Sequence, residues 1–159
     1  IDFYVYTGGE VPHASSTHSD WFIQSKKIVA ESLQLDEFSR RNHLPRIGLI
    51  KMDCELHEIA ALRGMKRLLF EDRPVIIMEV LFSQSEEVSE GVERNEYIEI
   101  ESMLKDKGYS FYLMNKTALV RVDRLEYNAD HRNYLFSPRR SEKVYLHYSN
   151  MVELIQQLL

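Results

Sequence analysis

The stretch that decides the fold is IGLIKMDCELHEIAALRGMKRLLFEDRPVIIMEV, which runs from Ile47 to Val80. It opens with a short apolar run ending in Lys51-Met52-Asp53, and such a run is typical of a buried strand in a parallel sheet. Apolar side chains then recur at helical spacing from His57 to Phe70, and Val75 to Leu81 form a second apolar strand interrupted only by Glu79. A strand, a helix and a strand within about 35 residues indicate a βαβ unit with a right-handed crossover.

The residues before this unit predict short strands, a long loop and a short helix. Ile1 to Tyr6 are rich in β formers and predict a strand, and Thr7 to Asp20 predict a long loop with glycines, a proline and hydroxyl side chains. Lys27 to Leu33 fit a short strand. Asp36 then begins a short helix whose first turn is acidic.

The residues after the unit predict a loop, a helix and a hairpin. Ser83 to Arg94 are acidic and polar and predict a mobile loop. Glu96 to Lys107 predict a helix that ends at Gly108 as its C-terminal cap. Two strands, Tyr109 to Met114 and Ala118 to Val122, are joined by a short loop and predict an antiparallel hairpin.

The last part of the chain contains few predicted elements. Asp123 to Glu142 are polar with scattered aromatics and predict neither a helix nor a strand. Met151 to Leu159 predict a closing helix. No repeat or linker is present, so we expect a single domain over residues 1–159. The fold class is α/β, with a mostly parallel sheet that ends in an antiparallel hairpin. In such sheets ligands bind beyond the carboxyl ends of the strands.

Composition excludes some classes of function. The 159 residues are 44% apolar, which suffices for one core, and the net charge of −5 gives no basis for nucleic-acid binding. No apolar run of about 18 residues is present, so we expect no membrane span. The single cysteine, Cys54, cannot form an intrachain disulfide, which fits a cytoplasmic protein. The chain opens directly on a strand-like segment, so we expect it to be an excerpt whose targeting segment, if any, lies upstream.

The central stretch resembles the signature region of FkbM-family methyltransferases. That family has a strand ending Lys-Ile-Asp-Val-Glu-Gly, a helix of the form Glu-x-x-x-Leu-x-Gly and a strand of the form Arg-Pro-x-Ile-x-x-Glu. The matching residues here are Lys51, Asp53, Glu55, Glu58, Leu62, Gly64, Arg73, Pro74 and Glu79. The pair Leu35-Asp36 and the triplet Lys107-Gly108-Tyr109 extend the resemblance, which spans roughly Leu33 to Met114.

The resemblance implies a Rossmann-like class I methyltransferase fold that uses S-adenosylmethionine (SAM). Members of this fold open with a glycine-containing turn that holds SAM. Gly8-Gly9 leads into Glu10-Val11-Pro12 instead of a helix, so we expect the cofactor turn to lie before Ile1 and this chain to be the C-terminal part of the domain. The family glycine after the glutamate is Leu56 here, and a leucine there would narrow the pocket or change the turn.

Asp53 and Glu55 are the first candidate site residues. They are alternate residues at the end of a strand, so both point the same way if the extended conformation continues. Paired carboxylates can orient the SAM ammonium, accept a proton from a hydroxyl or bind a divalent cation. The alternative is that one of them caps the helix beginning near His57.

His57 and Glu79 complete the candidate site. His57 suits a general base because histidine changes charge near neutral pH, although a surface histidine with a local hydrogen bond is an equal alternative. Glu79 stands in its strand as Asp53 does in its own, so adjacent parallel strands would bring both to one crevice, where they would bind cofactor. Lys51 would pair with one of these acids. Asp53, Glu55 and His57 do not form a recognised metal motif, so we expect no metal.

The function that the resemblance implies is methyl transfer from SAM to a hydroxyl of a small molecule or sugar, with Asp53, Glu55 and His57 placing or deprotonating the acceptor. The alternative is a non-catalytic α/β binding module derived from a methyltransferase, which Leu56 and the absent cofactor turn favour. A third reading, another Rossmann-like enzyme using a nucleotide or metal, lacks GxGxxG and P-loop motifs. A sheet without its first strands exposes an edge, so we also expect a homodimer or dependence on upstream sequence.

Overall fold

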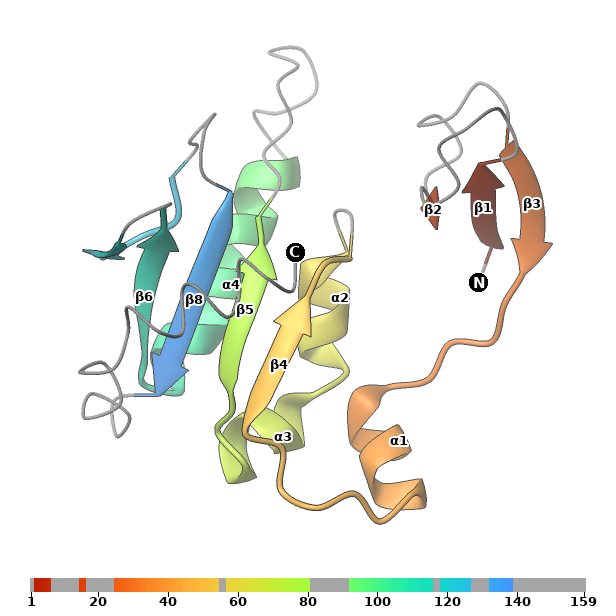
Figure 1. Cartoon of the computed structure of the whole chain (residues 1–159), viewed down its shortest axis with the longest axis horizontal. Coiled ribbons are helices and arrows are strands. Elements are labelled where there is room, and N and C mark those ends of the chain that lie inside the picture. Colours follow the sequence, from red (N-terminus) through yellow and green to blue (C-terminus); the bar gives the residue numbers. More distant parts are fainter. Residues whose placement is uncertain are drawn as a thin grey trace.

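The computed structural model describes residues 2–6, 15–16, 25–54, 57–80, 92–115, 118–126 and 132–138. The strands in these ranges are β1 Asp2–Tyr6, β2 Ser15–Ser16, β3 Ser25–Val29, β4 Leu49–Met52, β5 Val75–Glu79, β6 Tyr109–Met114, β7 Leu119–Val122 and β8 Asn133–Pro138. The helices are α1 Leu35–Arg41, α2 Glu58–Arg63, α3 Lys66–Glu71 and α4 Val92–Asp106. One sheet has the strand order β2-β1-β3, and the other has the order β4-β5-β8-β6-β7 (Figure 1). The molecule is therefore a mixed α/β protein, as predicted.

The predicted βαβ unit is present, because β4 and β5 are parallel neighbours and α2 and α3 connect them. The single predicted helix from His57 to Phe70 is divided in two at Gly64 and Met65. Met65 leaves the helical conformation, with φ −130° and ψ 29°. A Cβ on Gly64 would lie 3.3 Å from the Ala61 carbonyl oxygen, which is a tight contact, and at an ordinary contact distance of 3.5 Å from the Cα of Gln34 in the preceding loop.

The expectation of a mostly parallel sheet is wrong. In the five-stranded sheet, only the β4–β5 pair is parallel, and the β5–β8, β8–β6 and β6–β7 pairs are antiparallel. The cause is β8, which lies in the stretch from Asp123 to Glu142 where no element was predicted. It inserts between β5 and β6 and runs against both. Because β8 runs against both β5 and β6, strands β4, β5 and β6 run in one direction. The predicted antiparallel hairpin of β6 and β7 is confirmed.

Strand β4 is less buried than predicted. It lies at the end of the strand order, and of its residues only Met52 is buried. Leu49 is 60% exposed. The apolar run therefore marks an edge strand with one covered face.

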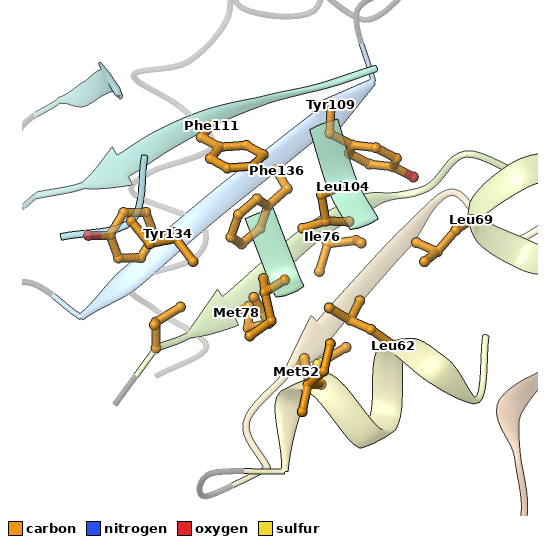
Figure 2. Packing of buried hydrophobic residues seen from close by; sticks show 14 of the residues in the cluster. Met52, Leu62, Leu69, Ile76, Met78, Leu104, Tyr109, Phe111, Tyr134 and Phe136 are labelled. Atoms are coloured by element: carbon orange, nitrogen blue, oxygen red, sulfur yellow. The ribbon is translucent and has the colours of Figure 1, made fainter. Parts of the chain in front are cut away.

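The core lies between the sheet and helices α2, α3 and α4. Apolar residues of the helices, such as Leu62 and Leu104, pack in one cluster with Ile76, Met78 and Phe136 of the central strands (Figure 2). These sheet residues occupy alternate positions, so the helices cover the same face of the sheet. The opposite face of β4 and β5 carries the positions discussed below.

Other predicted elements are confirmed in part. Helix α1 begins with acidic residues as expected, and Gly108 ends α4 with φ 75°, as a C-terminal glycine cap requires. Helix α4 begins at Val92, earlier than expected, and so takes in the end of the predicted loop from Ser83 to Arg94. The rest of that loop, and the predicted helix from Met151 to Leu159, lie outside the described residues. Among the described helices, none combines the length and apolarity that crossing a bilayer requires.

Candidate active site at the carboxyl edge of β4 and β5

The parallel register places Asp53 and Glu79 at the same level of the sheet. Lys51 is opposite Ile77 and Met52 is opposite Met78, so the next residues along the chain are Asp53, which directly follows β4, and Glu79, the last residue of β5. Neighbouring strands lie about 4.8 Å apart. The two carboxylates therefore belong to the same carboxyl edge, where ligands of open α/β sheets bind.

Asn133 adds a third polar position to this edge. The antiparallel register pairs it directly with Glu79, so the two side chains lie on the same face of the sheet. Both side chains are half-buried. Asp53, Glu79 and Asn133 thus form a row across three neighbouring strands, which we call the polar row. Sequence reasoning missed Asn133 because it missed the strand that it begins.

Asp53 is held only lightly by the fold. Its carboxylate accepts a hydrogen bond from the Lys51 ammonium at 3.2 Å, and about half of each side chain is exposed. This confirms one of the partners predicted for Lys51. An exposed pair of this kind contributes roughly 0–1 kcal/mol to stability, so a ligand can replace it at little cost.

Glu55 lies outside the described residues, and its pairing with Asp53 stays a prediction. Strand β4 ends at Met52, and Asp53 and Cys54, which follow it, are not in strand conformation. The N-cap position of α2 belongs to His57, whose side chain makes no capping hydrogen bond. The described part of the site therefore gives no support to helix capping by Asp53.

His57 is anchored beside this edge by its backbone. Its N–H donates to the carbonyl of Cys54 at 3.1 Å, and its own carbonyl accepts from the Ala61 N–H at 3.0 Å. The residue is partly buried. These two hydrogen bonds fix the backbone at the start of α2. His57 follows Asp53 by four residues in the chain, so it stays a candidate proton acceptor.

Glu58 is a further carboxylate that sequence reasoning treated only as a motif position. Its side chain is 5% exposed, although glutamate is almost never this buried in proteins without a specific reason. A carboxylate in the first turn also suits the positive end of the helix dipole. Its signal in the sequence was the motif match at Glu58 itself, directly after His57.

The family assignment comes from a comparison with protein-family models. The model described as the methyltransferase FkbM domain matches residues 3–111, well over half of the chain. The chain belongs to the FkbM methyltransferase family. Comparisons with curated proteins and with solved structures found no match. The matched region begins well before Leu33, which is the first residue of the motif resemblance.

Several residues of the FkbM motif are structural and lie away from the polar row. The Asp36 carboxylate accepts hydrogen bonds from the backbone N–H groups of Arg67 and Leu68, at 2.8 and 3.0 Å. It therefore caps the start of α3, where Met65 provides no cap. The Asp36 N–H donates to the Gly64 carbonyl at 3.0 Å, which ties α1 to the break between α2 and α3.

The Arg-Pro part of the FkbM motif is also structural. The guanidinium of Arg73 lies over the Tyr109 ring, 5.9 Å from its centroid. Arg73 has φ 52°, an unusual value for a residue with a side chain. This contact joins the start of β5 to the start of β6, at the end of the sheet opposite the polar row. The motif thus divides into these structural positions and the acids at or near the polar row.

The FkbM family implies SAM as the methyl donor, and the polar row fits part of that cofactor. Carboxylates suit the ammonium group and the ribose hydroxyls of SAM, and the Asn133 amide offers both a donor and an acceptor. The predicted cofactor turn has no counterpart in the described ranges. Within those ranges no three acidic, histidine or cysteine side chains gather in a way that could hold a metal ion.

Proposed function

We propose that the protein transfers the methyl group of SAM to a hydroxyl oxygen of a small-molecule or sugar acceptor, at the carboxyl edge of β4 and β5. The observation that carries the proposal is the β4–β5 register, whose last pair, Met52 and Met78, directly precedes Asp53 and Glu79 in a chain of the FkbM family. We also propose that the sheet is part of a Rossmann-like class I fold, because β4, β5 and β6 share one direction.

Asp53 and Glu79 are the residues proposed to hold the cofactor. Asp53 directly follows β4 and Glu79 ends the neighbouring β5, so together their carboxylates can accept hydrogen bonds from an ammonium group or from two hydroxyls. Asp53 is available because its partner Lys51 is exposed and weakly bound. When bound, SAM supplies a methyl group carried by a positively charged sulfur.

Asp53, Glu55 and His57 are the residues proposed to act on the acceptor. The acceptor hydroxyl must lose its proton as its oxygen takes the methyl group, and His57 or a nearby carboxylate can receive that proton. Positioning contributes most, because the acceptor oxygen must lie in line with the methyl group. The anchored start of α2 gives His57 a fixed backbone for this role.

Calorimetric titration of SAM tests the proposal. The titration uses this chain and a second chain that carries whatever coding sequence precedes Ile1. We expect binding by the longer chain, and we expect Glu79→Gln or Asp53→Asn to weaken it by about tenfold or more, as loss of a charged hydrogen bond does. Asp123→Asn is the matched control, because Asp123 is exposed and follows β7 at the other end of the strand order.

The second candidate function is a non-catalytic binding module, and Leu56 at the position of the family glycine favours it. SAM binding by neither chain would support this candidate and contradict the methyltransferase. Binding that Glu79→Gln and Asp123→Asn weaken equally would move the cofactor site away from the polar row.

A further inference from the structure

A hollow of about 450 Å³ lies beside α1 and α3, away from the polar row. Its lining includes Ser39, Arg40, His43, Arg46, Arg67 and Asp72. Arg46 precedes β4 and Asp72 precedes β5, so the hollow lies at the amino ends of these strands, near the tails of their arrows in Figure 1. The four residues of β4 alone span roughly 13 Å, which separates the hollow from Asp53.

The three arginines of the hollow come from three different segments, and each donates hydrogen bonds to another residue of the chain. Arg40 donates from Nε and Nη2 to Glu37, at 3.0 and 2.7 Å. Arg46 donates from the same two nitrogens to the backbone carbonyl of Asp72, at 3.2 and 2.9 Å. Arg67 donates from Nη1 to Glu71 at 2.7 Å. A guanidinium has five N–H groups, so each arginine keeps donors for a ligand beyond those used in these contacts.

The charge that lines the hollow is mainly positive. Glu37 and Glu71 pair with arginines but do not line the hollow, and the hydrogen bonds from Arg40 and then from Arg41 lower the pKa of Glu37 to about 2. Asp72 is the one acid in the lining, and its carboxylate accepts the Ile47 N–H at 3.0 Å. The printed contacts of Arg46 go to a neutral carbonyl, so its charge is the least compensated.

We propose that this hollow binds the phosphate group of a small molecule. Three guanidinium groups from three segments provide the planar, charge-assisted donors that phosphate oxygens prefer. Ser39 adds a buried hydroxyl from α1, and the volume lies within the usual range of small-molecule sites. The site is separate from the polar row and does not depend on methyl transfer.

The test is titration of the protein with inorganic phosphate and with glucose 6-phosphate, at constant ionic strength, followed by calorimetry or NMR. The key variants are Arg40→Gln and Arg41→Gln. Both remove one charge from α1 and one salt bridge to Glu37, but only Arg40 lines the hollow. We expect Arg40→Gln to weaken binding about tenfold and Arg41→Gln to leave it within about twofold. Arg67→Gln provides a second lining variant, and thermal melting shows that each variant is folded.

Tighter binding of glucose 6-phosphate than of inorganic phosphate supports a phosphorylated metabolite, and equal binding supports free phosphate as the ligand. The absence of saturable binding of either probe at millimolar concentration would overturn the proposal. Equal weakening by Arg40→Gln and Arg41→Gln would overturn it as well, because the effect would then be one of overall charge.

Discussion

Asp36 shows how one side chain of α1 determines the start of another helix. Its carboxylate accepts the N–H groups of Arg67 and Leu68, which α3 cannot satisfy itself. We predict that Asp36→Ala lowers the free energy of unfolding by about 1–2 kcal/mol, the usual loss for a helix cap. Urea unfolding measures it. Asp123→Ala, which removes an exposed carboxylate, should change stability by less than about 0.5 kcal/mol.

Tyr109 has a buried hydroxyl whose effect on the free energy of unfolding can be measured. Its Oη has no hydrogen-bond partner among the described residues, and burial raises the pKa of Tyr109 to about 12, against a smaller opposing effect of Arg73. Because the folded pKa exceeds the unfolded value near 10, the folded state keeps a proton that the unfolded state loses. Stability is therefore complete below about pH 10 and falls as the pH rises toward 12, by up to about 1.4 kcal/mol per pH unit.

Tyr109→Phe is the variant that tests this account. It keeps the ring beneath Arg73 and removes the unsatisfied hydroxyl, so we predict a gain of roughly 1 kcal/mol at neutral pH. We also predict a smaller loss of stability between about pH 9 and about pH 11 than in the wild type. Urea unfolding at both pH values measures the difference. A variant that is less stable at neutral pH and equally sensitive to alkali would show that the hydroxyl is satisfied.

At the scale of elements, the end of α4 depends on one backbone conformation. Gly108 has φ 75°, which residues with a Cβ adopt only with strain. We predict that Gly108→Ala lowers the free energy of unfolding by about 1 kcal/mol. Gly48→Ala is the matched control, because a Cβ there would meet no atom within 4 Å. Equal losses in the two variants would show that the φ of Gly108 is not the cause.

The elements also show what the sequence could reveal. Periodic segments such as α4, and the hairpin of β6 and β7, were predictable because their signals are local. Strand β8 was not, since its six residues lie in a polar stretch and end in Pro138, which is a poor sign of a central strand. The break between α2 and α3 was hidden for a related reason: it depends on Asp36, a contact remote in sequence.

At the scale of the whole molecule, the sequence predicted which two strands form the site but not the third strand that contributes to it. Asp53 and Glu79 could be placed together because parallel strands align their ends, and the register agrees. Asn133 could not, because it reaches the edge through an unpredicted strand. Homodimer formation stays a prediction, and the exposed Leu49 on edge strand β4 is consistent with it. Light scattering checks this, and a clean monomer would contradict it.

The central claim is that the carboxyl edge of β4 and β5 holds the methyl donor. Amide hydrogen exchange with and without SAM, on whichever chain binds it, tests this most directly. We expect slower exchange at residues 53–54, 57–60 and 79–80, with no change in α1 or at the arginine-lined hollow. Slower exchange confined to other parts of the chain, with these residues unchanged, would contradict it.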